Sequence, residues 1–467
     1  MSRRRKTKIQ KIRPVINPFA AAADIGAREI YAAVPVELSE TPVRRFGTFT
    51  DELKQLVAWL VELKITTMAL EATSVYWIPL AELLEEAGIA VCLVNPRHVQ
   101  NVSGRKSDVM DCQWLQYLHA VGLLRGAFRP SAEVRAVRAL WRHRDALVRQ
   151  SGWYIQHLHK ALDQMNVQVH HVLTDITGVT GTAIIEAIIK GQRDPRVLAS
   201  YRDKRVKATE QTLVSALTGD YRHEHLFCLQ QAYEAYQFTK QQIVAVDKAL
   251  EHELARLDTK AAAPDTTAPN PAAPEATAQD AAAPKQSRPK ASNKHPLAYP
   301  AQARLTALCG VDLTTIPSIQ ILTAHTIWAE LGSDLSAFPT SKHFCSWLSL
   351  CPDNRTSAGK CLSTKTRPSA NRVAHALRMA AQGCHHAKHE LGDYYRRMRA
   401  KLGAAEGLVA TAHKIARIVY AVLTTRRPYD PSLHEHAVLQ RERRNVTRLH
   451  NLAQKLGFQL VPHQPAI

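Results

Sequence analysis

The sequence lacks the features that would place it outside the cell or in a membrane. Its eight cysteines form no Cys-x-x-Cys pair, no secretory signal peptide is evident, and no apolar run is long enough to cross a bilayer. We therefore expect a cytoplasmic protein with reduced thiols and no membrane partner.

Zinc binding is another class that the sequence supports poorly. Cysteine and histidine residues gather between positions 343 and 386, but their spacings fit no common zinc module. We favour buried thiols over a metal site in this region. The residues concerned are His343, Cys345, Cys351, Cys361, Cys384, His385 and His386.

Acidic residues are few relative to basic ones. The chain has 61 Lys and Arg against 41 Asp and Glu, which gives a net charge of +20. Between positions 341 and 450 there are 20 basic and 7 acidic residues, and the chain begins MSRRRKTKIQKIR. Such stretches suit a partner with many phosphates, because each neutralised phosphate releases a counterion. A basic protein with no nucleic-acid role remains the alternative.

The chain is too long for one compact core, so we expect several domains. Apolar runs in FAAAADIGAREIYAAVP (19–35), ITTMALEA (65–72) and AVCLVNP (90–96) predict strands, and WIPLAELLEEAG and SDVMDCQWLQYLHAVGLL predict helices, the second N-capped near Ser107. Alternating strands and helices indicate an α/β domain over 15–130.

The rest of the chain is predicted to be mainly helical. Residues 131–258 form a helical region, in which helically spaced apolar residues call for an antiparallel partner helix or an oligomeric coiled coil. Residues 259–298 are Ala- and Pro-rich, which predicts a flexible linker. A mainly α-helical domain follows at 299–440, and then a basic tail at 441–467. The apolar residues are Ile243, Val246, Leu250, Leu254 and Leu257.

Four acids stand out in the first predicted domain. Asp24 and Glu71 end apolar strands, and Asp108 and Asp111 are three residues apart on one helix, so their side chains project from the same face. Four clustered carboxylates need a cation between them, and hard oxygen ligands suit Mg²⁺ or Mn²⁺. A helix-capping or solvated role remains the alternative for any single acid.

Several segments resemble, in order, the motifs of the DEDD transposases, insertion-sequence recombinases related to Piv-type DNA invertases. The region at 165–207 also resembles a helical region found in a subset of these enzymes. The matching segments are ADIG (23–26), LEATSVYW (70–77), NPRHVQNVSGRKSDVMDCQWL (95–115) and NRTSAGKCLSTK (354–365).

The resemblance implies a RuvC/RNase H-like N-terminal domain, a coiled-coil-like middle region and a C-terminal domain with a nucleophilic serine. The metal-binding tetrad would be Asp24, Glu71, Asp108 and Asp111, and the nucleophile Ser357. It also implies donor and target DNA as partners, a guide RNA encoded by the element, and a homo-oligomer, a dimer or, when active, a tetramer. The bacterial cytoplasm and nucleoid would be its location.

The segment around Ser357 contains no His, Asp or Glu between 354 and 365, so the serine has no local base. The tetrad must then reach it, from the same chain or from a neighbour. Basic and amide side chains are candidates to hold the phosphates. The predicted nucleic-acid contacts are Arg105, Lys106, Lys360, Lys365, Arg367, Asn371 and Arg372.

Two stretches depart from the family pattern. A Gly-rich turn that resembles a DNA-backbone clamp is replaced by TTIPSIQILTAH (314–325), which has no glycine, so this clamp is in doubt. The familiar Ser-Lys-x-Gly-Asn stretch is TKTRPSANR, in which Ala370 stands in place of the glycine and Asn371 is retained.

The leading interpretation is a transposase that moves its own element through a phosphoserine intermediate. A RuvC-like nuclease, in which metal-bound water attacks and Ser357 is structural, is one alternative. The other is a non-catalytic nucleic-acid-binding protein.

Overall fold

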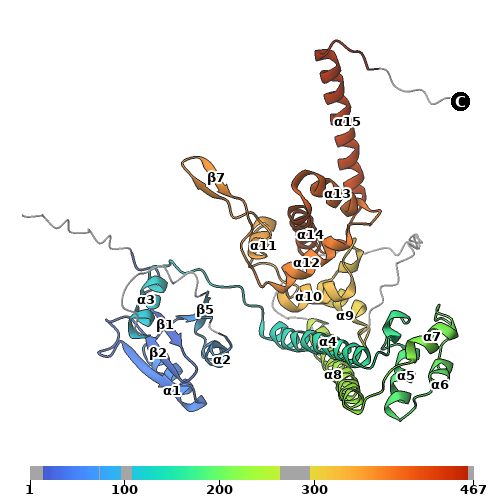
Figure 1. Ribbon diagram of the computed structural model, residues 1–467. Helices are drawn as coiled ribbons and strands as arrows, with labels where there is room; N and C mark the ends of the chain where they lie inside the picture. The colour runs from blue at the N-terminus through green and yellow to red at the C-terminus, as the bar shows by residue number, and fades with distance from the viewer. Residues whose placement is uncertain (1–13, 73, 96–107, 263–294, 461–467) are drawn as a thin grey trace, which may run out of the picture. The chain divides into compact units, whose positions relative to one another are not determined.

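The computed structural model describes residues 14–72, 74–95, 108–262 and 295–460 (Figure 1). The chain divides into two compact units, Met1–Arg129 and Pro130–Ile467.

The first unit is built on a five-stranded sheet with the order β3-β2-β1-β4-β5. The central strand β1 pairs antiparallel to β2 and parallel to β4, β3 is antiparallel to β2, and β5 is parallel to β4. The strands are β1 (Ala20–Ile25), β2 (Glu29–Ala33), β3 (Val43–Gly47), β4 (Thr67–Glu71) and β5 (Ala90–Val94).

Helices cover both faces of this sheet. On one face, α1 (Thr50–Glu62) and α2 (Trp77–Glu86) pack against the odd-numbered residues of β1, such as Ala21 and Ala23. On the other face, α3 (Asp108–Ala120) packs through Leu115 against Ala22 and Ala69. Four alanines in a row, all fully buried, let helices approach β1 closely from both sides.

The sequence patterns predict β1, β2, β4, β5, α2 and α3 to within a few residues, and the mixed α/β character of this unit is confirmed. They do not assign β3 or α1. Strand β3 is an edge strand with two exposed arginines, Arg44 and Arg45, so it lacks a clear apolar alternation. Ser107, the predicted N-cap of α3, lies outside the described residues.

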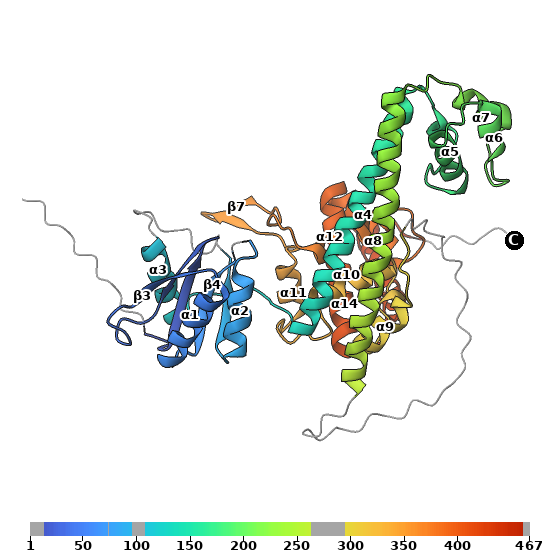
Figure 2. The same ribbon diagram turned by 90° about the horizontal axis from the view of Figure 1, so that it is seen from below.

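The second unit begins with a long helical pair, α4 (Ala132–Gln164) and α8 (His223–Ala262), seen side by side in Figure 2. The two helices run antiparallel, because Arg144 pairs with Asp247 while the end of α4 and the start of α8 share one apolar cluster. The partner for the predicted apolar stripe of α8 is thus supplied within the chain. Its residues Ile243, Val246, Leu250 and Leu254 are buried, and Leu257 is half-buried.

Three short helices complete the cluster at the end of this pair. They contribute Ile184, Ile185, Leu198 and Leu213, which pack against Leu162 of α4. The helices are α5 (Val179–Ile189), α6 (Pro195–Ser200) and α7 (Glu210–Leu217), preceded by the short η2 (Val169–His171).

The rest of the second unit is helical apart from one β-hairpin, and it follows the linker, most of which lies outside the described residues. Helix α10 packs on α4, and α12 packs on α10 and α14. The elements are α9 (Ala301–Cys309), η3 (Leu313–Thr315), α10 (Ile321–Leu331), α11 (Ser341–Trp347), β6 (Arg355–Ser357), β7 (Lys360–Ser363), α12 (Arg372–Gly383), α13 (Glu390–Leu402), α14 (Ala404–Thr425) and α15 (Ser432–Lys455).

Among the described residues, one helix, α14, is long and apolar enough to cross a membrane. It packs against α11, α12 and α13, and Ala412, Ile415, Ala416 and Val419 on it are fully buried. We therefore regard α14 as the core helix of this part of the unit.

Candidate functional site

Two of the four predicted carboxylates lie on neighbouring strands of the first unit. Strands β1 and β4 pair in parallel up to Ala23 and Leu70, so Asp24 and Glu71 follow at the same height, at the carboxyl ends of the strands. Because side chains alternate along a strand, both acids share the face that α3 covers. Both are half-buried.

Helix α3 carries the other two acids. Asp108 is its first residue, and Asp111 is exposed in its first turn. The side chain of Asp108 lies outside the described part of the structure, as do the predicted nucleic-acid contacts Arg105 and Lys106.

Cys112, next to Asp111, fastens the first turns of α3 to the sheet. Its thiol donates to the backbone oxygen of Tyr31, with Sγ and O 2.9 Å apart, and lies 3.4 Å from the oxygen of Ala22. Burial raises the pKa of Cys112 to about 12, with backbone hydrogen bonds at Asp24 and Ala33 opposing the shift and the negative charge of Asp24 adding to it. The contact with Ala22, two residues before Asp24 on β1, places the first turns of α3 next to the end of β1.

An open depression lies at the turn between β1 and β2, with a volume of about 500 Å³. Asp24 is part of its lining. The turn depends on Gly26, whose N–H donates to the oxygen of Glu29 at 2.9 Å, while a Cβ on Gly26 would lie only 3.0 Å from that same oxygen. The lining residues are Asp24, Gly26, Ala27, Arg28, Glu29 and Tyr31.

The donors that meet at this edge of the sheet are carboxylate oxygens. Asp24 and Glu71 fit the preference of Mg²⁺ and Mn²⁺ for hard oxygen ligands. Among the side chains that the structure describes, no three His, Cys, Asp or Glu residues converge tightly enough to hold a metal by themselves. A cation here would be bound by these two acids together with residues of the first turn of α3 and with water or phosphate oxygens.

Ser357 lies at the tip of an exposed β-hairpin in the second unit, within a domain that the sequence predicts to be mainly α-helical. It is the last residue of β6 and pairs with Lys360, the first residue of β7. Both residues are exposed, and so is Leu362. Because neither face of the hairpin is buried, no apolar alternation marks its strands in the sequence.

The turn that follows Ser357 consists of two residues, Ala358 and Gly359. Their φ angles are 47° and 78°, as in the tight type I′ turns that join antiparallel strands. An alanine rarely adopts such a φ. The turn thus holds the serine at the end of a strand with a strained residue directly after it.

The predicted phosphate-binding residues fall into two groups. Lys360 and Lys365 are exposed. Arg367 is exposed too, but its Nη2 donates to the backbone oxygen and to Oγ of Ser346, both at 3.1 Å. These three side chains lie on or directly after the hairpin.

Asn371 and Arg372 make contacts within the protein that the sequence analysis does not assign. The Oδ1 of Asn371 accepts from the N–H of Ala374 at 3.0 Å, so Asn371 is the N-cap of α12. Arg372 Nη1 lies 2.7 Å from Asp145 Oδ2 of α4. A capping signal was present in the sequence, since Asn precedes the amphipathic run of α12, but the partner of Arg372 is 227 positions away.

Ser318 occupies the turn where glycine is absent from TTIPSIQILTAH. Its φ is 71°, which glycine adopts without strain and serine does not. Its Oγ lies 3.1 Å from Cys384 Sγ and 3.2 Å from His389 Nε2. The left-handed turn therefore persists, and the serine side chain ties it to the segment between α12 and α13.

The four cysteines between positions 343 and 386, for which the sequence predicts buried thiols and not a zinc site, differ in exposure. Cys345 and Cys384 are buried, as predicted, and Cys351 is half-buried. The prediction of a buried thiol is wrong for Cys361, which is exposed on β7.

Comparison with protein families gives two matches. A family of DEDD transposases of the IS110 type, described as Transposase, matches residues 21–167. A second, described as Transposase IS116/IS110/IS902 family, matches residues 310–396. The first match contains Asp24, Glu71, Asp108 and Asp111, and the second contains Ser357. Comparison with curated proteins gives no match.

Proposed function

Because the chain belongs to the DEDD transposases of the IS110 type and is a DNA transposase, we propose that Ser357 is its nucleophile and that Asp24, Glu71, Asp108 and Asp111 form its metal-binding tetrad. The observation that carries the proposal is the position of Ser357, exposed at a hairpin tip beside Lys360 and within one family match, while the acids gather within the other. The RuvC-like fold that we infer for the first unit is supported by the strand order and by the acids at the ends of β1 and β4.

The proposed reaction conserves the energy of the phosphodiester. The Ser357 oxygen forms a bond to phosphorus, the bond from phosphorus to one deoxyribose oxygen breaks, and the serine proton ends on that leaving oxygen. The reverse attack by a hydroxyl of another strand releases the serine and joins the strands. No high-energy cofactor is needed, since one phosphodiester is exchanged for another.

The roles of the remaining residues follow from their places. Asp24 and Glu71, with Asp108 and Asp111, would hold Mg²⁺ or Mn²⁺, which when bound makes a hydroxyl more acidic and neutralises charge on phosphate oxygens. Lys360 is the cationic neighbour of Ser357 across the hairpin and would neutralise charge that grows on the phosphate. The acids can come from the same chain or from another subunit of a dimer or tetramer.

We further propose that a noncoding RNA encoded by the element pairs with donor and target DNA, and that the enzyme works in the bacterial cytoplasm on the nucleoid. The support is the family match and the basic charge. The DNA that flanks the gene tests the RNA role: a structured noncoding stretch complementary to the ends of the element and to its insertion site is expected. Flanks without such a stretch would contradict it.

A denaturing gel tests the central step. Wild-type protein incubated with DNA that carries the ends of the element should form an adduct that resists denaturant and disappears on protease treatment. Ser357→Ala should form none and exchange no strands, whereas Ser363→Ala, a serine of the same hairpin, should behave as wild type. Cleavage by Ser357→Ala at the wild-type rate, with no adduct in either protein, would instead establish a nuclease that uses water.

A further inference from the structure

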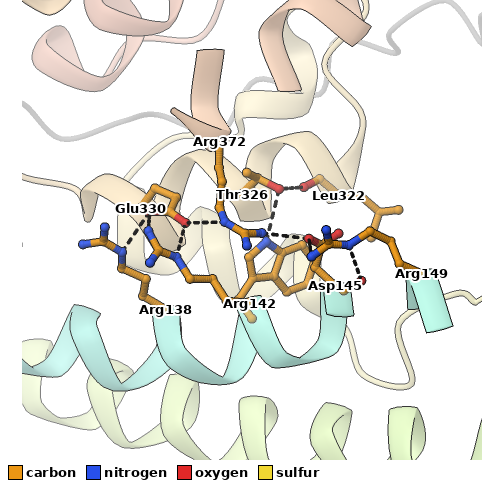
Figure 3. A network of polar contacts seen from close by, with 9 residues as sticks. Arg138, Arg142, Asp145, Arg149, Leu322, Thr326, Glu330 and Arg372 are labelled. Carbon is orange, nitrogen blue, oxygen red and sulfur yellow. Dashed lines mark hydrogen bonds and ion pairs between the residues drawn. The ribbon is translucent and has the colours of Figure 1, made fainter. Parts of the chain in front are cut away.

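Three arginines converge on one buried carboxylate in the second unit (Figure 3). Glu330 of α10 is only 5% exposed, and Arg138 and Arg142 of α4 reach its Oε2 at 2.8 and 2.7 Å. Arg142 also donates from Nε to Oε1 at 2.8 Å. The Nε of Arg372 of α12 lies 4.0 Å from the same Oε1.

A second carboxylate continues the network. Asp145, one helical turn after Arg142 on α4, accepts from Arg372 Nη1 at 2.7 Å and lies 3.2 Å from Nη2 of Arg149. The Asp145 side chain is 46% exposed, so water competes with Arg372 for hydrogen bonds to its carboxylate. Burial and hydrogen bonding therefore fix the Glu330 end of the network, and the Asp145 end is open to solvent.

The charges of this network do not cancel. Four guanidinium groups, those of Arg138, Arg142, Arg149 and Arg372, face two carboxylates. The arginine side chains are 27%, 41%, 67% and 37% exposed, respectively. Guanidinium groups bind phosphate in a bidentate manner, and Glu330 holds two of them in a fixed orientation before any ligand arrives.

The position of the network connects it to the serine hairpin. Arg372 is the first residue of α12, which follows the hairpin after an eight-residue connection, 364–371. Helix α4 is fixed against α10 at the same level, since Trp141 Nε1 donates to Thr326 Oγ1 at 3.1 Å. The connection from the hairpin therefore leads directly into the network through Arg372.

We propose that Arg138, Arg142, Arg149 and Arg372 form an arginine pad that binds the phosphate backbone of the DNA strand that Ser357 attacks. The choice of DNA rests on the proposed role of Ser357. Phosphate displaces the solvent-exposed Asp145 from Arg372, while Glu330 keeps Arg138 and Arg142 in place. The pad adds residues of α4, far from the hairpin in sequence, to the binding surface.

Fluorescence anisotropy with a labelled DNA duplex of arbitrary sequence tests the pad on the full-length protein. Arg142→Gln should weaken binding roughly five- to tenfold at about 0.1 M salt and should lower the slope of log K against log salt by about one. The matched control is Arg205→Gln, which removes an arginine from an exposed ion pair with Asp203 elsewhere in the unit. Wild-type affinity and slope in a folded Arg142→Gln protein would overturn the proposal.

A second pair of variants covers the case in which Arg142→Gln fails to fold. Asp145→Asn removes the acid that competes with phosphate and leaves every arginine of the pad in place. It should strengthen DNA binding severalfold and steepen the salt dependence, whereas Asp203→Asn should do neither. Weaker or unchanged binding by a folded Asp145→Asn protein would contradict a pad that binds phosphate.

The same titrations with an RNA duplex separate the two nucleic acids. Loss of RNA affinity alone in Arg142→Gln would overturn the assignment to DNA. These titrations measure affinity and not covalent chemistry, so their result is independent of whether Ser357 forms an adduct with DNA. A water-dependent nuclease would leave the pad intact, and a serine transposase can fail this test while still forming its adduct.

Discussion

Asp24 and Glu71 stand level with each other on adjacent parallel strands, one residue beyond the paired Ala23 and Leu70. Two carboxylates at equivalent positions on neighbouring strands repel each other unless a cation lies between them. Chelation of divalent ions should therefore stop DNA cleavage, and Mg²⁺ or Mn²⁺ should restore it.

Substitution of either acid should have the same effect on the chemical step. Asp24→Asn and Glu71→Gln should each slow cleavage by at least about 100-fold, because the loss of several kcal/mol of charge stabilisation corresponds to that factor or more. Duplex binding should be retained, and Glu62→Gln, an exposed acid at the end of α1, should cleave as wild type. Gel-based cleavage rates give the comparison, and wild-type rates in both substituted proteins would show that these two acids are not part of the catalytic site.

The turn at the hairpin tip should respond in opposite directions to two substitutions. Ala358→Gly relieves a positive φ and should stabilise the hairpin by up to about 1 kcal/mol, whereas Gly359→Val should destabilise it by a similar or larger amount. Hydrogen exchange of the hairpin amides reports both changes. Gly383→Ala, at a glycine without a positive φ and with open space around it, is the control that should leave the hairpin unchanged.

Thiol modification should distinguish the two kinds of cysteine. Cys112 is fully buried with its pKa raised to about 12, so almost no thiolate forms near neutral pH. Iodoacetamide at pH 8 should label Cys361 and Cys228, which are exposed, and should leave Cys112 unlabelled until the protein unfolds. Mass spectrometry of peptides checks this, and rapid labelling of Cys112 in the native protein would contradict its contact with the sheet.

The buried His325 should make the second unit sensitive to acid. Its ring stacks on Trp141 with centroids 3.8 Å apart, its Nε2 lies 2.6 Å from the Tyr299 hydroxyl, and burial lowers its pKa from 6.5 to about 3. Below pH 6.5 the unfolded chain binds a proton that the folded protein does not. The free energy of unfolding should thus fall by up to about 1.4 kcal/mol per pH unit between pH 6.5 and 3, and this contribution is complete above pH 6.5.

Urea unfolding at pH 7 and pH 5 measures this effect. His325→Phe keeps a ring beside Trp141 but cannot take up the proton, so its stability should change less between the two pH values than that of the wild type. The exposed His223 gives the control, and His223→Gln should keep the wild-type dependence. An equal pH dependence in His325→Phe and the wild type would show that His325 is not responsible.

The sequence predicts the strand-end acids well because their strands are apolar and end at polar residues. An apolar run followed by Asp24 or Glu71 is a local signal, and parallel pairing then brings the two together. The helical spacing of Asp108 and Asp111 is equally local. The pairing order of the strands is not a local property, and the residues of β3 do not predict its place at the edge of the sheet.

The hairpin and the arginine network needed long-range information. The hairpin buries neither face, so its strands leave no pattern in the residues around Ser357. The basic, Ser-rich stretch before Arg372 predicts a phosphate ligand. In the structure, however, the charged groups nearest to Arg372 are the carboxylates of Asp145 and Glu330. Asn371, which is predicted to touch nucleic acid, also caps α12, a role that the sequence analysis does not assign.

Helix α4 has mechanical consequences because its 33 residues form a rod about 50 Å long. Its C-terminal end packs in an apolar cluster with the short helices α5, α6 and α7. Nearer its N-terminal end, Arg142 and Asp145 form ion pairs with α10 and α12. A stiff rod does not absorb a tilt along its length. A displacement of the cluster of short helices would therefore move α4 and, through the ion pair of Asp145 with Arg372, the first turn of α12.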